Sequence, residues 1–184
     1  MQSRLLLSAA AVALLVAAPA LAQQPSAAQP RQTLSQADAN FVKEAAIGSK
    51  FEVETGQLAE RNAANAQVKQ FGARMVQDHG NASKQLNAIV SGKGATLPQE
   101  LDPKHAQLHD RLARLKGAEF DRAYMDAMVK DHDEDSQKFG QEADNGNDPD
   151  IKQFARTTLA VIKDHDRMAH EIANSLVATG SSAR

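Results

Sequence analysis

Four long stretches with helical periodicity constrain the fold of this chain more than any other feature of its sequence. In each stretch an apolar residue returns at every third or fourth position, as it does on the buried face of an amphipathic helix. The stretches cover approximately residues 35–62, 65–92, 117–145 and 149–177. All six prolines lie outside them or at a first helical position, where proline is tolerated. Because no segment shows the alternation typical of a strand, the sequence predicts an all-α protein.

Polar residues mark where the first two helices begin. Ser35 and Asp38 have the spacing of a capping box, with Asp in the position that is usually Glu. Asn65 is suited to cap the second helix, because its side chain can accept hydrogen bonds from the first free backbone N–H groups. We therefore expect a first helix that begins at Ser35 and a second that ends at Gly92 or Gly94.

A segment rich in helix-breaking residues separates the second long helix from the third. Residues 91–103 read SGKGATLPQELDP, which predicts a long loop. The dipeptide Asp102-Pro103 combines an N-cap with a proline at the first helical position, and it predicts a short helix to about Lys116. Asp148-Pro149 repeats this signal before the last long helix. The expected fold is a four-helix bundle with a long crossover that contains a short extra helix.

The N-terminus carries the features of a secretory signal peptide. Arg4 precedes an apolar run from Leu5 to Ala18, and Ala20 and Ala22 are the small residues that a signal peptidase recognises. The run is too short for a transmembrane helix, and no later segment approaches the length of one. We expect cleavage after Ala22 and a periplasmic or otherwise exported protein of the cell envelope. The chain then divides into a signal peptide, a disordered leader, the bundle domain and a C-terminal tail, at residues 1–22, 23–34, 35–178 and 179–184.

The composition excludes several classes of partner. The 21 Lys and Arg residues nearly balance the 23 Asp and Glu residues, so no attraction to nucleic acid or to an anionic membrane is expected. Cysteine is absent, which excludes disulfides, thiolate metal sites and thiol nucleophiles. Aromatic residues make up 4% of the chain, too few to form platforms on which bases or sugars stack. A protein partner in the cell envelope is compatible with this composition, and the sequence does not determine the oligomeric state.

Three of the predicted long helices place one histidine in their apolar stripe. These are His79 in the second long helix, His132 in the third and His165 in the fourth. With ~1.5 Å of rise per residue, all three lie roughly 19–22 Å from the same end of the bundle, and Glu52 of the first helix lies at about 18 Å. Glu44 and Glu54 lie on a second stripe of that helix that is almost as apolar, so the inward-facing acid is open between them and Glu52.

This set of side chains allows two interpretations. Buried histidines are usually hydrogen-bonded, here to Glu52, Tyr124 or the aspartate that precedes each histidine. Three at one level also suit a single transition-metal ion, Zn, Fe, Cu or Mn, in a tetrahedral or five-coordinate site. The candidate metal ligands are His79, His132, His165 and Glu52. Asp78, Asp131 and Asp164 lie about 100° away around their helices, and we expect them to be solvated or to pair with neighbouring residues.

Other charged groups are expected to belong to the surface. His105 and His109 have the i,i+4 spacing of a chelating pair, but no third ligand is evident. The run from Asp131 to Asp135 lies within a helix and lacks the glycine of a calcium-binding loop, so we expect it to be solvated. A polar face near His170 is expected to be exposed. No nucleophile-elbow pattern is present, and we assign no catalytic residue.

Three segments of the sequence resemble a known family. They are MVQDH at residues 75–79, GAEFDRAYMDAMVKDH at 117–132 and DPDIKQFA at 148–155. Together they are similar to the domain of unknown function 4142 family, over about residues 36–176. The resemblance implies an exported bacterial protein with a ferritin-like four-helix fold, and it implies no established activity. The Glu-x-x-His pairs of ferritin-like di-iron sites do not occur in this chain, so we do not expect a ferroxidase.

The sequence leaves three interpretations of the function open. The one we favour is an exported helical bundle without enzymatic activity that holds one metal ion at the histidine site. A metal-dependent or redox enzyme at the same site would also need an open coordination position and a channel for its substrate. A structural or stress-related envelope protein would need no ligand. Metal stoichiometry and access to the site distinguish the three.

Overall fold

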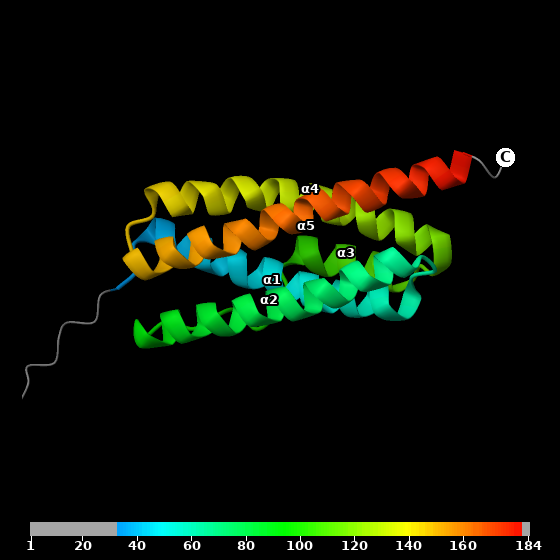
Figure 1. Cartoon of the computed structure of the whole chain (residues 1–184). Coiled ribbons are helices and arrows are strands. Elements are labelled where there is room, and N and C mark those ends of the chain that lie inside the picture. Colours follow the sequence, from blue (N-terminus) through cyan, green and yellow to red (C-terminus); the bar gives the residue numbers. More distant parts are fainter. Residues whose placement is uncertain (1–32, 182–184) are drawn as a thin grey trace, which may run out of the picture. The chain divides into compact units, whose positions relative to one another are not determined.

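The structure, a computed structural model, describes residues 33–181 and, within them, the side chains of residues 33–178. This part of the chain contains no strand and consists of five helices and their connections (Figure 1): α1 (Gln36–Asn62), α2 (Ala66–Gly92), α3 (Pro103–Ala113), α4 (Gly117–Asn145) and α5 (Pro149–Ser181). None of these helices is long and apolar enough to cross a membrane. The predicted signal peptide and most of the predicted leader lie outside the described residues, so cleavage after Ala22 stays a prediction.

The four long helices pair as two hairpins. α1 packs against α2 and α4 against α5, and the hairpins join with α1 beside α4 and α2 beside α5. At one end the Asp121 carboxylate accepts hydrogen bonds from the backbone N–H groups of Ala64 (3.1 Å) and Asn65 (3.0 Å), so α4 begins beside the α1–α2 turn. At the other end Lys93 pairs with Asp148 at 2.8 Å, so α2 ends where α5 begins. Each long helix is antiparallel to its neighbours, and the predicted all-α four-helix bundle with a crossover is confirmed.

The crossover leads from the end of α2 to the start of α4 and contains α3, which packs mainly on α1. α3 ends at Ala113, short of the predicted end near Lys116. The reason is local: the N–H groups of Arg114 and Leu115 bond to carbonyls three residues back, which tightens the last turn. Gly117 then has a φ of 63°, a conformation that glycine adopts without the steric cost of a Cβ.

The predicted N-caps are in place. The side chain of each N-cap accepts a hydrogen bond from a backbone N–H group in the first turn of its helix. The four N-caps are Ser35, Asn65, Asp102 and Asp148. The acidic partner of Ser35 departs from a capping box, because the Asp38 carboxylate accepts from the Ser35 hydroxyl (2.7 Å) and from the backbone N–H of Asn147 (2.8 Å). Asp38 therefore ties the start of α1 to the turn between α4 and α5.

The end of α5 differs from the prediction. The helix extends to Ser181, beyond its predicted end near Val177. A single glycine inside a helix costs only about 1 kcal/mol relative to alanine. Gly180 is therefore not enough to end the helix.

A polar layer divides the core of the bundle. Towards the α1–α2 turn, buried apolar side chains form one cluster that includes Phe51 and Met75. Towards the other end they form a second cluster that includes Leu86 and Ile162. Between the clusters lie four buried polar side chains, one on each long helix: Glu52, His79, His132 and His165. Polar groups cost free energy in a core unless they find partners, so this layer is the candidate site of the molecule.

Candidate metal centre

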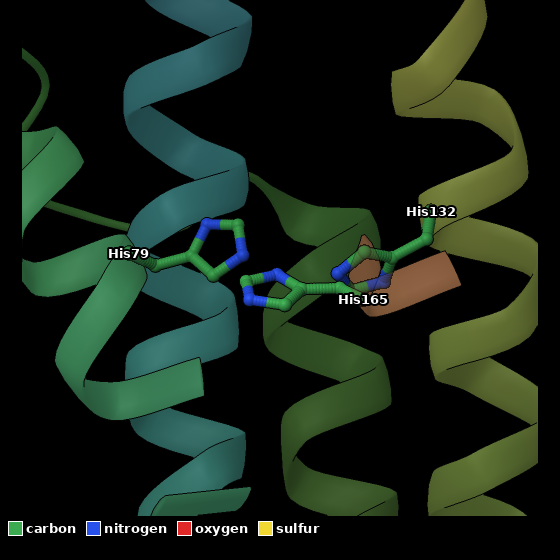
Figure 2. Close-up of side chains that lie close together, drawn as sticks. All are labelled: His79, His132 and His165. Carbon is green, nitrogen blue, oxygen red and sulfur yellow. The ribbon is translucent and has the colours of Figure 1, made fainter. Parts of the chain in front are cut away.

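The four side chains that the sequence places at one level lie together in the core. Glu52 is 1% exposed, His79 is 4% exposed, and His132 and His165 are fully buried. The centroids of the three rings lie 5.3–5.8 Å apart. One nitrogen from each ring lies within 4.8 Å of the nitrogens from the other two, and Figure 2 shows the rings gathered between the helices. The predicted positions are thus observed, while the role of these residues as ligands stays a prediction.

Glu52 lies against two of the imidazoles. Its Oε2 is 2.6 Å from Nδ1 of His79, and its Oε1 is 3.2 Å from Nε2 of His132. Both distances are short, but neither pair is aligned as a hydrogen bond, and within residues 33–178 both Glu52 oxygens lack a hydrogen-bond partner. The two alternatives left open by the sequence point outward, with Glu44 61% and Glu54 33% exposed. Glu52 is therefore the inward-facing acid of α1.

Two of the rings are anchored through the nitrogen that points away from the cluster. Nδ1 of His132 donates to the carbonyl oxygen of Met128 at 2.9 Å, and Nε2 of His165 donates to Oδ2 of Asp78 at 2.9 Å. In these tautomers the second nitrogen of each ring carries a free lone pair. Among the described residues Nε2 of His79, Nε2 of His132 and Nδ1 of His165 have no hydrogen-bond partner. Metal-ligating histidines have this arrangement, with one nitrogen bonded to a carboxylate or carbonyl and the other free for the ion.

Burial keeps two of the imidazoles in the neutral form that binds metals. It lowers the pKa of His79 to about 4, against the attraction of nearby aspartates. It also lowers the pKa of His165 to about 4, with the neighbouring His79 adding to the effect. Burial raises the pKa of Glu52 to about 8, opposed by His132, so this carboxyl is protonated at neutral pH when no cation is present. A divalent ion would favour its ionised form.

Asp78 orients His165 from the edge of the layer. Its carboxylate, 24% exposed, accepts hydrogen bonds from His165 and from Arg74 (3.2 Å). Burial acts to raise the pKa of Asp78, but the two hydrogen bonds outweigh it and hold that pKa below its usual value. The residue is therefore an anionic acceptor for the outward nitrogen of a layer histidine.

A cavity reaches the layer from the groove between α2 and α5. Its volume is about 300 Å³. It is lined by Asp78, His79, Asn81, Ala82, Gln85, Thr157, Thr158, Val161 and Ile162. A space of this size admits several waters or a small molecule, so the histidine cluster is accessible on the side of His79.

The charged run on α4 differs from the prediction. The sequence predicted a solvated run from Asp131 to Asp135. In the structure the Asp135 side chain is only 15% exposed, and Oδ2 of Asp131 is buried without a hydrogen-bond partner in the described part of the chain. The two residues are four positions apart and share a face of the helix, where Glu52 meets them from α1. His132 lies between these two aspartates in the sequence and points inward. Its position was the signal from which their partial burial could have been predicted.

Tyr124 does not hydrogen-bond to the histidines. It is fully buried, yet its hydroxyl has no hydrogen-bond partner within residues 33–178. Burial and the charge of Glu52 raise the pKa of this hydroxyl well above its usual value. The interpretation of the layer as hydrogen-bonded core histidines therefore lacks one of its predicted partners.

The remaining histidines lie outside the layer. His105 is 2.8 Å from Asp102 and His109 is 3.4 Å from Asp110. Among the residues that the structure describes, no third ligand lies close to this pair. His170 is 48% exposed and belongs to a surface group with two aspartates, in agreement with the expected polar face.

Comparisons with known sequences point to one family. The sequence model of the family described as Domain of unknown function (DUF4142) matches residues 22–172. This range includes α1 to α4, most of α5 and all four candidate ligands. No curated protein sequence matches the chain significantly.

Two crystal structures have a similar fold. A DUF305 fragment from Deinococcus radiodurans has a TM-score of 0.69 and 12% identity, covering 78% of this chain and 99% of its own. A DUF305 protein from Streptomyces coelicolor, described as a proposed secreted protein, has a TM-score of 0.65 and 15% identity, covering 76% and 92%. At these identities the similarity concerns the helical fold alone.

Proposed function

Because this chain belongs to the family Domain of unknown function (DUF4142), whose description names no activity, we propose a function from the site itself: the bundle binds one transition-metal ion in its polar layer. The proposed ligands are His79, His132 and His165, through their three unpaired nitrogens, and Glu52. The proposal is for a metal-binding protein rather than an enzyme, and it assigns no catalytic residue.

The observation that carries the proposal is the pattern of paired and unpaired nitrogens. In a core of hydrogen-bonded histidines the inward nitrogens would have partners, since a buried polar group left unpaired costs about 1–3 kcal/mol. Here the outward nitrogens of His132 and His165 are bonded, while within the described residues the inward ones are not. A metal ion would satisfy them together. At Zn–N distances of about 2.0–2.1 Å, tetrahedral ligand nitrogens lie roughly 3.4 Å apart, so nitrogens within 4.8 Å of one another need small side-chain movements.

The donor set narrows the choice of ion. Three imidazoles and one carboxylate, without a thiolate, suit Zn²⁺, Cu²⁺ and Fe²⁺ better than Mg²⁺ or Ca²⁺. The usual order of stability for divalent ions places Mn²⁺ lowest and Cu²⁺ highest. We expect the affinities of the site for these ions to follow that order. Which ion occupies the site in the cell then depends on which metal is available there.

Elemental analysis of protein purified from its native compartment tests the proposal. We expect one ion of Zn, Cu or Fe per chain in the wild type and less than a tenth of that in His79→Ala. His109→Ala, at a 28% exposed histidine outside the layer, should keep the full content. A wild-type protein that carries no metal and takes up none of Zn²⁺, Cu²⁺, Mn²⁺ or anaerobic Fe²⁺ would overturn the proposal and favour a structural protein without a ligand.

The cavity beside His79 favours a second candidate function, a metal centre that reacts with a small molecule. Its volume of about 300 Å³ adjoins the layer, and four protein ligands leave a further position in a five-coordinate site. If small molecules reach the ion, azide should change the visible spectrum of the Co²⁺-loaded protein. Ala82→Phe would fill the cavity, and it should weaken azide binding with unchanged metal content. If azide does not alter the spectrum, small molecules do not reach the ion. The second candidate function is then rejected, and metal binding alone is retained.

Export is a further part of the proposal. Its support is the sequence, with Arg4, the apolar run and the small residues Ala20 and Ala22. The fold is also similar to that of the Streptomyces coelicolor protein described as a proposed secreted protein. The intact mass of protein from the periplasmic fraction should correspond to a chain that starts at Gln23. A membrane-bound species that retains Met1 would contradict the proposal.

A further inference from the structure

A second group of potential ligands lies beside the histidines. Glu52 of α1 and Asp131 and Asp135 of α4 each offer a carboxylate oxygen, and these three oxygens lie within 4.8 Å of one another. The helical repeat brings Asp131 and Asp135 to one face of α4, on either side of His132. Glu52 is thus shared between this acidic group and the histidine cluster.

The protein itself compensates this acidic group poorly. Glu52 is 1% exposed, and in the described chain both of its oxygens and Oδ2 of Asp131 lack hydrogen-bond partners. Lys138 contacts Asp135 at 3.7 Å, but it is 45% exposed and also pairs with Glu44. Three carboxylates this close cannot all be ionised in a core without a cation among them. Protonation of Glu52 relieves this repulsion when no cation is present, whereas a divalent ion held by an unpaired oxygen of the buried Glu52 and by the two aspartates would allow all three carboxylates to be ionised.

We propose that Glu52, Asp131 and Asp135 bind a second cation, a hard divalent ion of the Mn²⁺, Mg²⁺ and Ca²⁺ class. Carboxylate oxygens suit these ions, whereas the imidazoles of the neighbouring cluster suit Zn²⁺ and Cu²⁺. Glu52 belongs to the acidic group and also contacts His79 and His132 of the neighbouring cluster, so it would lie between the two ions. Only this position between two ions rests on the proposed histidine site, because the second site uses oxygen ligands alone.

A titration of the full chain with two metals tests the second site. Protein loaded with one equivalent of Zn²⁺ is titrated with Mn²⁺, and free Mn²⁺ is followed by electron paramagnetic resonance. The wild type should bind one Mn²⁺ in addition to its Zn²⁺. The double variant Asp131→Asn, Asp135→Asn removes two charges with little change of shape, and it should bind Mn²⁺ at least tenfold more weakly and keep its Zn²⁺. Asp126→Asn, at an exposed position of the same helix, should behave as the wild type.

The outcomes separate this site from the histidine site. No Mn²⁺ binding by the wild type, or equal binding by the wild type and the double variant, would overturn the second site even if Zn²⁺ is retained. Mn²⁺ binding that the double variant loses, in a protein that takes up no Zn²⁺, would support the second site and reject the histidine site. Circular dichroism checks folding, and the single variant Asp135→Asn replaces the double variant in the titration if the latter does not fold.

Discussion

At the scale of single residues, Asp78 is the group that controls a candidate ligand from outside. Its carboxylate accepts from Nε2 of His165, so it fixes the tautomer and the rotation of that ring. Loss of such a partner usually weakens metal binding by about 10–100-fold. We predict a decrease of that size for Asp78→Ala, measured by competition with a chromophoric chelator. Asp164→Ala is the matched control, because it removes the other partner of Arg74 (2.9 Å) without a hydrogen bond to His165, and an equal loss in both variants would contradict the role of Asp78.

The same residues show what a sequence can predict at this scale. The apolar stripes predict that His79, His132 and His165 point inward, because the helix fixes the direction of each Cα–Cβ bond. Ring rotation and the acceptor of each outward nitrogen depend on contacts between helices. Asp78 and His165 are 87 residues apart in the chain, and no local pattern joins them. The sequence therefore predicted the residues of the layer but not its hydrogen bonds.

At the scale of helices, two glycines let α1 and α2 approach closely. A Cβ on Gly72 would lie 2.6 Å from Cβ of Ala59 and 2.8 Å from the carbonyl oxygen of Gly56. Gly72→Ala should therefore force the helices apart and destabilise the bundle by about 1–3 kcal/mol, as measured by urea denaturation. Gly80→Ala on the same helix is the control, because no atom lies within 4 Å of its Cβ position, and it should stabilise by roughly 0.5–1 kcal/mol. Equal effects at both positions would contradict the close approach.

A residue near the end of α4, Glu142, makes the stability of the bundle depend on pH independently of the histidines. Burial and a hydrogen bond to Asp38 raise the pKa of Glu142 from its usual 4.5 to about 7. The folded state therefore holds this proton more tightly, and the stability that it contributes is lost as the pH rises from about 4.5 to about 7. Asp38 has a lowered pKa, so its own contribution is lost only at lower pH.

Glu142→Gln should remove this dependence. Relative to the variant, the wild type should be most stable near pH 4.5 and lose that advantage by about pH 7, as followed by urea denaturation across this range. Glu100→Gln, in the exposed crossover, should leave the pH profile unchanged. A wild-type advantage that grows with pH would contradict the assignment.

The helices themselves were the most predictable level of the structure. Ser35, Asn65, Asp102 and Asp148 cap the helices that they were predicted to cap, because an N-cap acts within its own first turn. The predictions failed for side chains whose positions depend on contacts with distant parts of the chain. Asp38 accepts a hydrogen bond from the distant Asn147 as well as from the hydroxyl of its own cap, Ser35, and Asp135 lies partly buried beside Glu52.

At the scale of the whole molecule, the polar layer joins the two hairpins. Glu52 and His79 belong to the α1–α2 hairpin, and His132 and His165 belong to the α4–α5 hairpin. Packing within each hairpin is more extensive than packing between them. An ion in the layer would therefore link the halves of the fold where their mutual packing is weaker, and it would stabilise the assembled bundle rather than either hairpin alone.

This arrangement makes the metal-dependence of thermal unfolding the decisive measurement on the whole protein. An ion at a thousandfold excess over its Kd adds about 4 kcal/mol to a folded state that alone binds it, which corresponds to roughly 8–16 °C for a domain of this size. We predict such a rise for the wild type with at least one of Zn²⁺, Cu²⁺, Mn²⁺ or anaerobic Fe²⁺. His132→Ala should lose about 1–3 kcal/mol without metal and gain little from Zn²⁺, Cu²⁺ or Fe²⁺, because the α4–α5 hairpin then contributes only His165 to the histidine cluster. An equal rise in both proteins with one of these three ions would place that ion elsewhere, for example at the exposed group around His170, and no rise in either would leave the histidine cluster without a metal.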